Sequence, residues 1–364
     1  MRKPPLPALT GIRAPLAIGI VLFHFTPPHM RYLDPIIGNG FVFVGFFFLL
    51  SGFILSYNYA GRPGPFAKRD FWHARFARLY PVYLLALLLS FKMLQAEWHA
   101  RPHAEFWSGV ILTPLLLQGW SPSLATFWNT VAWTLSAEVV LYAAFPWLVR
   151  LPWPKKPGRL VALLLGIWAL GLVPQALYLW LNPDHLAGPA TRYSWGYWLR
   201  VLKYTPLAYA CTFLVGFALG RLEAALTFTP RQRTAVAAGS LIALALFFSL
   251  AVASVPYVLM HGGLLVPLFG ALILGLSGPN PVSSVFAWRP MVLLGQSSYC
   301  LYLLHFNAIN LVRQYDLPQR LHLAAFDPWL SYAAVLLLAI AAFYLVEEPA
   351  RIAILRYGKP VPKR

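Results

Sequence analysis

Two ionisable side chains interrupt the apolar stretch LTGIRAPLAIGIVLFHF, which covers residues 9–25. Arg13 and His24 are eleven residues apart, so on an α-helix they share one face and lie about 16 Å apart along the axis. A histidine can take a proton from a hydroxyl near neutral pH, and an arginine can hold an anion. Singly, Arg13 is also typical of a basic membrane anchor and His24 of an interfacial histidine. Their shared face favours a lined cavity within the membrane.

A carboxylate occurs in the next chemically informative stretch, FWNTVAWTLSAEVVLYAAFPWL. Glu138 lies inside this apolar run, where a charged side chain is costly unless it is paired or functional. Tyr142 follows at i+4 and so shares its helix face. A carboxylate can orient a histidine and stabilise its charged form. We therefore interpret Glu138 as a functional residue, with Tyr142 in support.

Basic residues cluster in GRPGPFAKRDFWHARFARLYPVYLL. Arg75 and Arg78 share a helix face at i, i+3, and Arg69 lies shortly before them. Such a cluster is ordinary for a cytoplasmic loop of a membrane protein. The alternative is an anion site for phosphate groups at the cytosolic surface.

Three further polar residues sit in apolar helical stretches. Ser51 belongs to a small-residue patch with Gly45 and Gly52, a pattern that allows close helix approach. Ser298 and His305 are seven residues apart on one predicted face, and His305 is equally consistent with a packed core histidine. We expect His24, Glu138 and His305 to gather in the outer half of the membrane, and Arg13, Arg75 and Arg78 in the inner half.

The elements that must position these residues are membrane helices. The 364-residue chain is 59% hydrophobic and only 11% charged, whereas soluble chains are about a quarter charged. Its formal charge of +18 fits cytoplasmic loops rich in Lys and Arg, and no basic tract indicates nucleic-acid binding. Cys211 and Cys300 lie in apolar runs and are interpreted as packing residues rather than a disulfide.

The hydropathy pattern predicts an all-α polytopic membrane protein, folded as a single domain over residues 1–364. The apolar runs fall near 9–25, 37–60, 79–96, 106–119, 131–149, 160–181, 202–220, 234–252, 257–277, 291–312 and 329–346. The run 106–119 is short of the ~20 residues that a crossing needs. Treating it as re-entrant or interfacial places most basic loops on one side. We predict about ten crossings with both termini cytoplasmic, and a first helix that is retained rather than cleaved.

Six stretches in this order resemble the acyltransferase 3 family of integral membrane acyltransferases. They are GIRAPLAIGIVLFHF, VGFFFLLSGFILS, RFARLYPVY, WTLSAEVVLY, SSYCLYLLH and EEPARI, and they span residues 9–351. The first contains the family's arginine, ten intervening residues and histidine. The sequence departs from the family at His73, where relatives often have a further arginine.

The resemblance implies transfer of an acyl group, often acetyl, from acetyl-CoA to a hydroxyl of an exported glycan, without a metal. His24 would be the catalytic histidine, Arg13 its essential partner and Glu138 the acidic residue. Arg75 and Arg78, with Arg69 nearby, would contact the phosphates of the coenzyme. The expected location is the bacterial inner membrane. Size is similar to xanthan-type exopolysaccharide acetyltransferases, whose acceptor would be a polysaccharide or lipid-linked oligosaccharide, so association with other glycan-assembly proteins is conceivable.

Other functions remain open from the residues alone. In a proton-coupled transporter or flippase of a glycan precursor, His24, Glu138 and His305 would form a proton relay. Clear inverted repeats or broken helices, which would favour that function, are not evident. A polymerase or ligase of glycan assembly, and a non-catalytic scaffold, are further alternatives. The scaffold leaves Glu138 unexplained.

Overall fold

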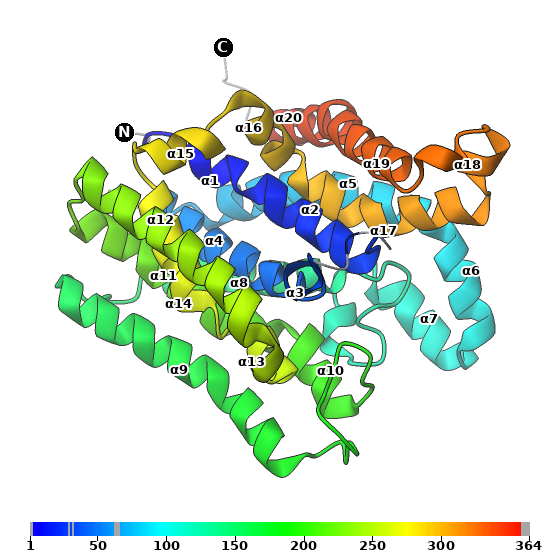
Figure 1. Cartoon of the computed structure of the whole chain (residues 1–364), viewed down its shortest axis with the longest axis horizontal. Coiled ribbons are helices and arrows are strands. Elements are labelled where there is room, and N and C mark those ends of the chain that lie inside the picture. The colour runs from blue at the N-terminus through cyan, green and yellow to red at the C-terminus, as the bar shows by residue number, and fades with distance from the viewer. Residues whose placement is uncertain (1–2, 28–29, 31–32, 62–65, 358–364) are drawn as a thin grey trace. The chain divides into compact units, whose positions relative to one another are not determined.

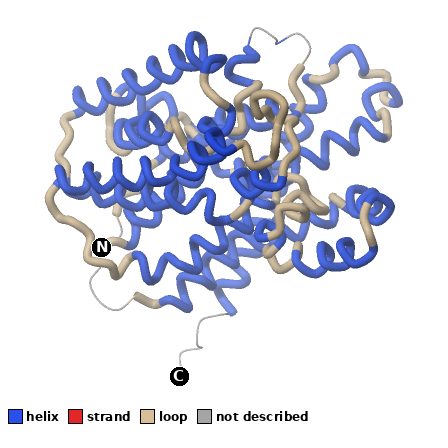
Figure 2. Tube along the Cα trace, turned by 90° about the horizontal axis from the view of Figure 1, so that it is seen from below, coloured by secondary structure: helices blue, strands red, loops and turns tan. Residues whose placement is uncertain are grey.

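The computed structural model describes residues 3–27, 30, 33–61 and 66–357, and this part of the chain contains helices and loops but no strand (Figure 2). Two compact units are present, and each combines two stretches of sequence. Unit 1 comprises Met1–Pro63 and Trp147–Val292, and unit 2 comprises Gly64–Pro146 and Leu293–Arg364. The all-helical class is confirmed, whereas a single domain over 1–364 stays a prediction.

Unit 1 is a helical bundle in which long apolar helices alternate with short ones (Figure 1). Prolines at the first helical position and side-chain caps begin several of its helices, as at Thr229, whose side chain forms a reciprocal capping box with Gln232. Its helices are α1 (Pro7–Gly11), α2 (Arg13–His24), α3 (Asp34–Ile37), α4 (Val42–Tyr59), α9 (Pro157–Leu181), α10 (Tyr197–Tyr204), α11 (Ala210–Ala225), α12 (Pro230–Leu246), α13 (Tyr257–His261), α14 (Val266–Leu276) and α15 (Pro281–Phe286).

The closest helix pair in unit 1 is α4 against α11. A Cβ atom added to Gly52 would lie 2.1 Å from the Phe213 carbonyl oxygen, and one added to Gly216 would lie 2.0 Å from the Leu49 carbonyl oxygen. Each glycine therefore lets a backbone approach that any side chain would block. The predicted close approach at Gly52 is confirmed. Gly45, by contrast, has open space around it, so its part in the patch was wrong.

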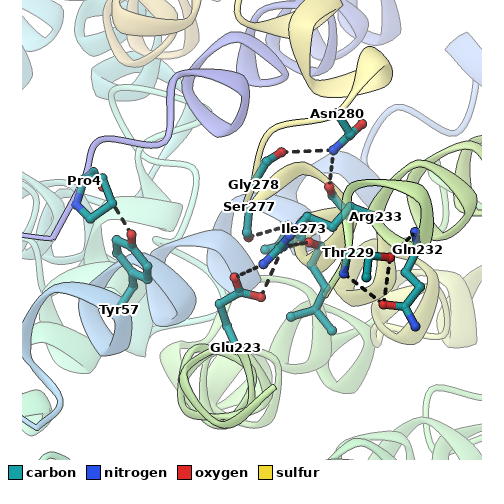
Figure 3. Close-up of polar contacts among 12 residues, drawn as sticks. Pro4, Tyr57, Glu223, Thr229, Gln232, Arg233, Ile273, Ser277, Gly278 and Asn280 are labelled. Atoms are coloured by element: carbon teal, nitrogen blue, oxygen red, sulfur yellow. Dashed lines mark hydrogen bonds and ion pairs between the residues drawn. The ribbon is translucent and has the colours of Figure 1, made fainter. Parts of the chain in front are cut away.

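One end of unit 1, which we call the α1 end, contains an ion pair whose side chains are only 12% and 9% exposed (Figure 3). The Arg233 guanidinium contacts the Glu223 carboxylate at 2.7 Å and also donates to the Leu274 carbonyl oxygen at 2.7 Å. Asn280 donates to the Gly275 and Gly278 carbonyl oxygens. These contacts hold the ends of α11, α12 and α14 together.

Unit 2 is built on the bent pair α5 and α6, whose axes differ by 62°. α17 and α20 pack on α5, and α17 also packs on α19. Tyr299 ties α17 to α5 by donating its hydroxyl hydrogen to the Leu79 carbonyl oxygen at 2.7 Å. The helices are α5 (Lys68–Leu89), α6 (Phe91–Ala100), α7 (His103–Leu112), α17 (Ser298–Gln314), α18 (Leu317–Arg320), α19 (Trp329–Ala342) and α20 (Glu348–Tyr357), and most of α8 (Trp133–Leu148). α16 (Arg289–Gln296) links the units in sequence.

Seven helical segments of the described chain are long and apolar enough to cross a membrane, or eight if the bent pair α5–α6 is one span. Two expected crossings fall short of 18 residues, because α8 has 16 and α17 has 17. The run 106–119 contains the last seven residues of α7, turns and the start of a 3-10 helix at Gln118–Trp120, which agrees with a segment too short to cross. A multi-pass protein is confirmed, while ten crossings and cytoplasmic termini stay predictions. The basic residues at Arg2 and in 358–364, used for that orientation, lie outside the described residues.

Candidate functional site

Arg13 and His24 are the first and last residues of one helix, α2. The helix forms because its apolar run contains no breaker after Pro15, which lies in the first turn, where no internal hydrogen bond is lost. Both side chains are half-buried. The predicted single helix is therefore confirmed. The end of unit 1 at which His24 lies is opposite the α1 end, and we call it the α10 end.

The neighbours of these two side chains come from other parts of unit 1. The Arg13 guanidinium lies 6.0 Å from the centre of the Phe47 ring on α4. The His24 ring meets the Phe23 ring edge-on, with centroids 5.0 Å apart. Phe23 is itself covered by Arg192, whose guanidinium carbon lies 3.8 Å from the ring centre. Aromatic and cationic groups thus surround the histidine end of α2.

In unit 2, Glu138 and Tyr142 are in direct contact, as the i+4 spacing predicts. The Tyr142 hydroxyl donates to the Glu138 carboxylate. Tyr142 is buried, and Trp72 donates its indole N–H to the Tyr142 carbonyl oxygen at 3.2 Å. The hydroxyl therefore fixes the orientation of a carboxylate that would otherwise be costly in an apolar helix.

The arginines of α5 meet this pair from one side. The Arg75 guanidinium lies 5.8 Å from the ring centres of Phe71 and Tyr142. Its buried Nε has no hydrogen-bond partner among the described residues. Arg78 lies close enough to Tyr142 and Tyr299 to act on them electrostatically. Arg69, in contrast, is exposed in the first turn of α5.

The remaining predicted site residues are largely packed into the helices that carry them. His305 is fully buried, and its Nδ1 lies 2.7 Å from the Tyr302 carbonyl oxygen and 3.1 Å from that of Leu301. Ser298 is buried and donates to the Gly295 carbonyl oxygen at 2.8 Å. Ser51 is half-buried on α4, next to Gly52. The hydrogen bonds described for His305 and Ser298 are to backbone carbonyl oxygens, and the supporting roles predicted for all three residues stay predictions.

The structure thus groups the predicted residues in two sets. Glu138, Tyr142, Arg75 and Arg78 lie together in unit 2, whereas Arg13, His24 and Ser51 belong to unit 1. The predicted gathering of His24 with Glu138 and His305 stays a prediction.

Two polar features were not identified from the sequence. Glu347, the last residue of a π-helical turn over Phe343–Glu347, is 3% exposed and accepts from the Cys300 thiol at 3.2 Å. Its neighbour Glu348 pairs with Arg351 at 2.6 Å, as expected for interfacial charges. Both cysteines are free, which agrees with their interpretation as packing residues.

The second missed feature is a group of cations at the α10 end, Arg192, Arg200 and Lys203. Lys203 is only 7% exposed. The sequence gives no signal for this burial, because nothing in the local sequence shows that α10 is packed against α13.

Comparison with known proteins relates this chain to acyltransferases. The family described as an acyltransferase domain matches residues 6–348. Acyltransferase MdmB of Streptomyces mycarofaciens is 31% identical over 157 residues, 40% of each chain. Peptidoglycan O-acetyltransferase OatA of Listeria monocytogenes is 24% identical over 95% of this chain and 56% of its own. O-acetyltransferase OatA of Staphylococcus aureus is 22% identical over 95% and 57%.

The chain therefore spans little more than half the length of these two O-acetyltransferases and less of MdmB. No solved structure matches it. The family match, in contrast, extends over nearly all the helices described above, including the histidine helix α2 and the Glu138 helix α8. The chain belongs to the acyltransferase 3 family.

Proposed function

We propose that this chain is a membrane O-acyltransferase that moves an acetyl group from acetyl-CoA to a sugar hydroxyl of an exported polysaccharide or its lipid-linked repeat unit. Family membership and the O-acetyltransferase names of the reported relatives support this function. The transporter alternative gains no support from those relatives.

The observation that carries the proposal is the placement of Arg13 and His24 at opposite ends of α2. Twelve residues of helix span about 18 Å, so one helix connects two depths of the membrane. The α1 end carries Lys3, Arg221, Arg231 and Arg233, against Arg192, Arg200 and Lys203 at the α10 end, and we take the more basic α1 end as the cytoplasmic face. A cytosolic donor would then enter at the Arg13 end and meet an exported acceptor at the His24 end.

The proposed chemistry is direct transfer. The His24 imidazole takes the proton of the acceptor hydroxyl, and the oxygen forms a bond to the thioester carbonyl carbon. The carbon–sulfur bond then breaks, and the departing thiolate takes the proton back from the imidazolium. General-base catalysis of this kind contributes about 10²–10⁴-fold. Arg13 is proposed to place the donor, and Glu138, held by Tyr142, to orient a reacting group.

For the coenzyme phosphates we propose Arg75 and Arg78, with Arg69 at the surface. The buried Nε of Arg75 lacks a hydrogen-bond partner among the described residues, so its N–H is available to donate to a bound anion. We further propose that the protein lies in a bacterial inner membrane and works beside other glycan-assembly proteins.

The test is NMR of the cell-surface glycan from a strain that lacks this gene, complemented with wild type, His24→Ala or His24→Gln. We expect O-acetyl signals to disappear in the deletion strain and to return only with wild type. The position of the lost signal identifies the acceptor sugar.

Membrane levels of each variant must match wild type, and His99→Ala, at an exposed position on α6, is the matched control. It should restore acetylation. Unchanged acetylation in every strain would refute glycan O-acetylation as the function of this chain.

A further inference from the structure

Three cations meet at the α10 end of unit 1, and one of them, Lys203, is buried. Arg200 and Lys203 are at i, i+3 on α10 and so share a face, and Arg192 comes from the preceding loop. Both arginines act electrostatically on the Lys203 ammonium. We call these three residues the cationic cluster.

The partners of the cationic cluster are aromatic rings. The Lys203 ammonium lies 5.3 Å from the Tyr204 ring centre and 5.4 Å from that of Tyr257. Arg200 lies 5.0 Å from the Trp195 ring centre. Ring faces attract cations, but they neutralise no charge. A buried ammonium beside two guanidinium groups is therefore left electrostatically unfavourable.

The Asp184 carboxylate, which lies at the start of α10, is held by neutral hydrogen-bond donors. Asp184 accepts from the backbone N–H groups of Trp198 and Leu199, at 3.0 and 2.8 Å, and from the Tyr178 hydroxyl at 3.0 Å. It thereby caps the start of α10. Within the described part of the chain, neither Arg192 nor Lys203 forms an ion pair.

Burial and the two arginines lower the pKa of Lys203 to about 8. The charged and titratable groups that face its ammonium, from α10, the loop and α13, are Arg192, Arg200, Tyr204, Tyr257 and His261. None of these groups is a carboxylate. An anion bound here would offset the mutual repulsion and raise the proton affinity of the lysine.

Exposed aromatic rings place the cationic cluster at the depth of lipid headgroups. Tyr193, Trp195, Tyr197 and Trp198 each have more than half of their surface exposed. Exposed Tyr and Trp side chains gather where a membrane meets water. The anionic groups at that depth are the phosphates of lipids.

We propose that the cationic cluster binds the phosphates of the lipid that carries the acceptor sugar, and so holds that sugar at the His24 end of α2. This inference rests on the proposed function. Three cations match a diphosphate, which carries more charge than a phospholipid headgroup. Arg192 provides the connection to the reacting end, because it donates to the Phe23 carbonyl oxygen at 3.0 Å, one residue before His24.

The test measures binding of farnesyl diphosphate to the full chain in nanodiscs of zwitterionic phosphatidylcholine, without acyl donor. Lys203→Met removes the charge and keeps an apolar stem of similar length. We expect it to weaken binding by about tenfold or more, since charge-assisted contacts are lost. Lys155→Met, at an exposed loop position, is the matched control and should bind like wild type.

Two further measurements keep the test decisive. Without ligand, Lys203→Met should unfold at a higher temperature than wild type, because it relieves repulsion; a lower midpoint with unchanged binding would overturn the proposal. Adding phosphatidylglycerol identifies the source of the phosphate. If it displaces farnesyl diphosphate at equal concentration, the acceptor assignment is wrong and the cluster holds ordinary headgroups.

The outcomes separate this inference from the proposed function. Diphosphate binding that depends on Lys203, in a chain that transfers no acetyl group, would refute the function and leave the phosphate site standing. Normal acetyl transfer, together with farnesyl diphosphate binding that Lys203→Met leaves unchanged, would refute only the phosphate site.

Discussion

The two ends of unit 1 bury positive charge in opposite ways. At the α1 end, Arg233 and Glu223 have side chains 12% and 9% exposed, and they satisfy each other with help from a backbone carbonyl (Figure 3). At the α10 end, Lys203 is buried at least as deeply, yet its neighbours are two arginines and aromatic rings. A buried cation that is paired with a carboxylate stabilises the fold, whereas a buried cation without a carboxylate is suited to binding an anionic ligand.

The largest loss of stability should come from removing one partner of the ion pair at the α1 end. Glu223→Ala leaves the Arg233 guanidinium buried without its counter-charge, so we expect a loss of about 3–5 kcal/mol in the free energy of unfolding. The double variant Glu223→Leu, Arg233→Met should recover most of that loss, because no charge then remains buried. Denaturant titration in mixed micelles measures both.

A more exposed ion pair gives the matched control. Glu105 pairs with Arg101 at 2.6 Å, but its side chain is 31% exposed. Glu105→Ala should cost about 0–1 kcal/mol. Equal losses for Glu223→Ala and Glu105→Ala would show that the largely buried pair at the α1 end contributes no more stability than an exposed pair.

The stability of the protein should depend on pH through Lys203 at the α10 end. The pKa of Lys203 is about 8 in the folded protein and near 10.5 when unfolded, so between these values the unfolded chain binds more protons. Stability should therefore rise as pH increases through this window, by at most about 1.4 kcal/mol per pH unit from this group. The destabilisation is fully present below pH 8.

The measurement compares wild type with Lys203→Met from pH 7 to 10.5 in ligand-free nanodiscs. The difference between the two midpoints should shrink as pH rises, which removes the contribution of every other titrating group. A constant difference would mean that Lys203 keeps an ordinary pKa and that the cluster is not strained.

A smaller effect is expected at the start of α10, the helix that carries Arg200 and Lys203. Asp184→Ala removes the cap of α10 and should cost about 1 kcal/mol. Asp184→Asn keeps an oxygen acceptor and should cost less. Hydrogen exchange of the amides in α10 reports the change, and equal exchange in both variants would contradict the capping role.

Helix-level features could be predicted because they depend on local spacing. The single helix from Arg13 to His24, the contact between Glu138 and Tyr142, and the close approach at Gly52 all follow from helical periodicity. The family, in contrast, was identified by the resemblance of six motifs, and the match over residues 6–348 confirms it.

Features that depend on tertiary packing could not be predicted. Glu223 and Arg233 come from different helices, and the cationic cluster combines a loop with α10 against α13. Glu347 is buried at the end of a π-helical turn, and such a turn has no clear sequence signal. The number of membrane crossings was also difficult to predict, because α8 and α17 are apolar yet shorter than a full span.

The central claim is that His24 acts as a base in acetyl transfer, and the rate of transfer tests it most directly. Membrane vesicles that contain wild type, His24→Gln or His99→Ala would be given radiolabelled acetyl-CoA, and label in the glycan fraction would be followed from the start. We expect His24→Gln to lose about 10²–10⁴-fold in initial rate while His99→Ala matches wild type. A rate for His24→Gln within a few-fold of wild type would contradict the account.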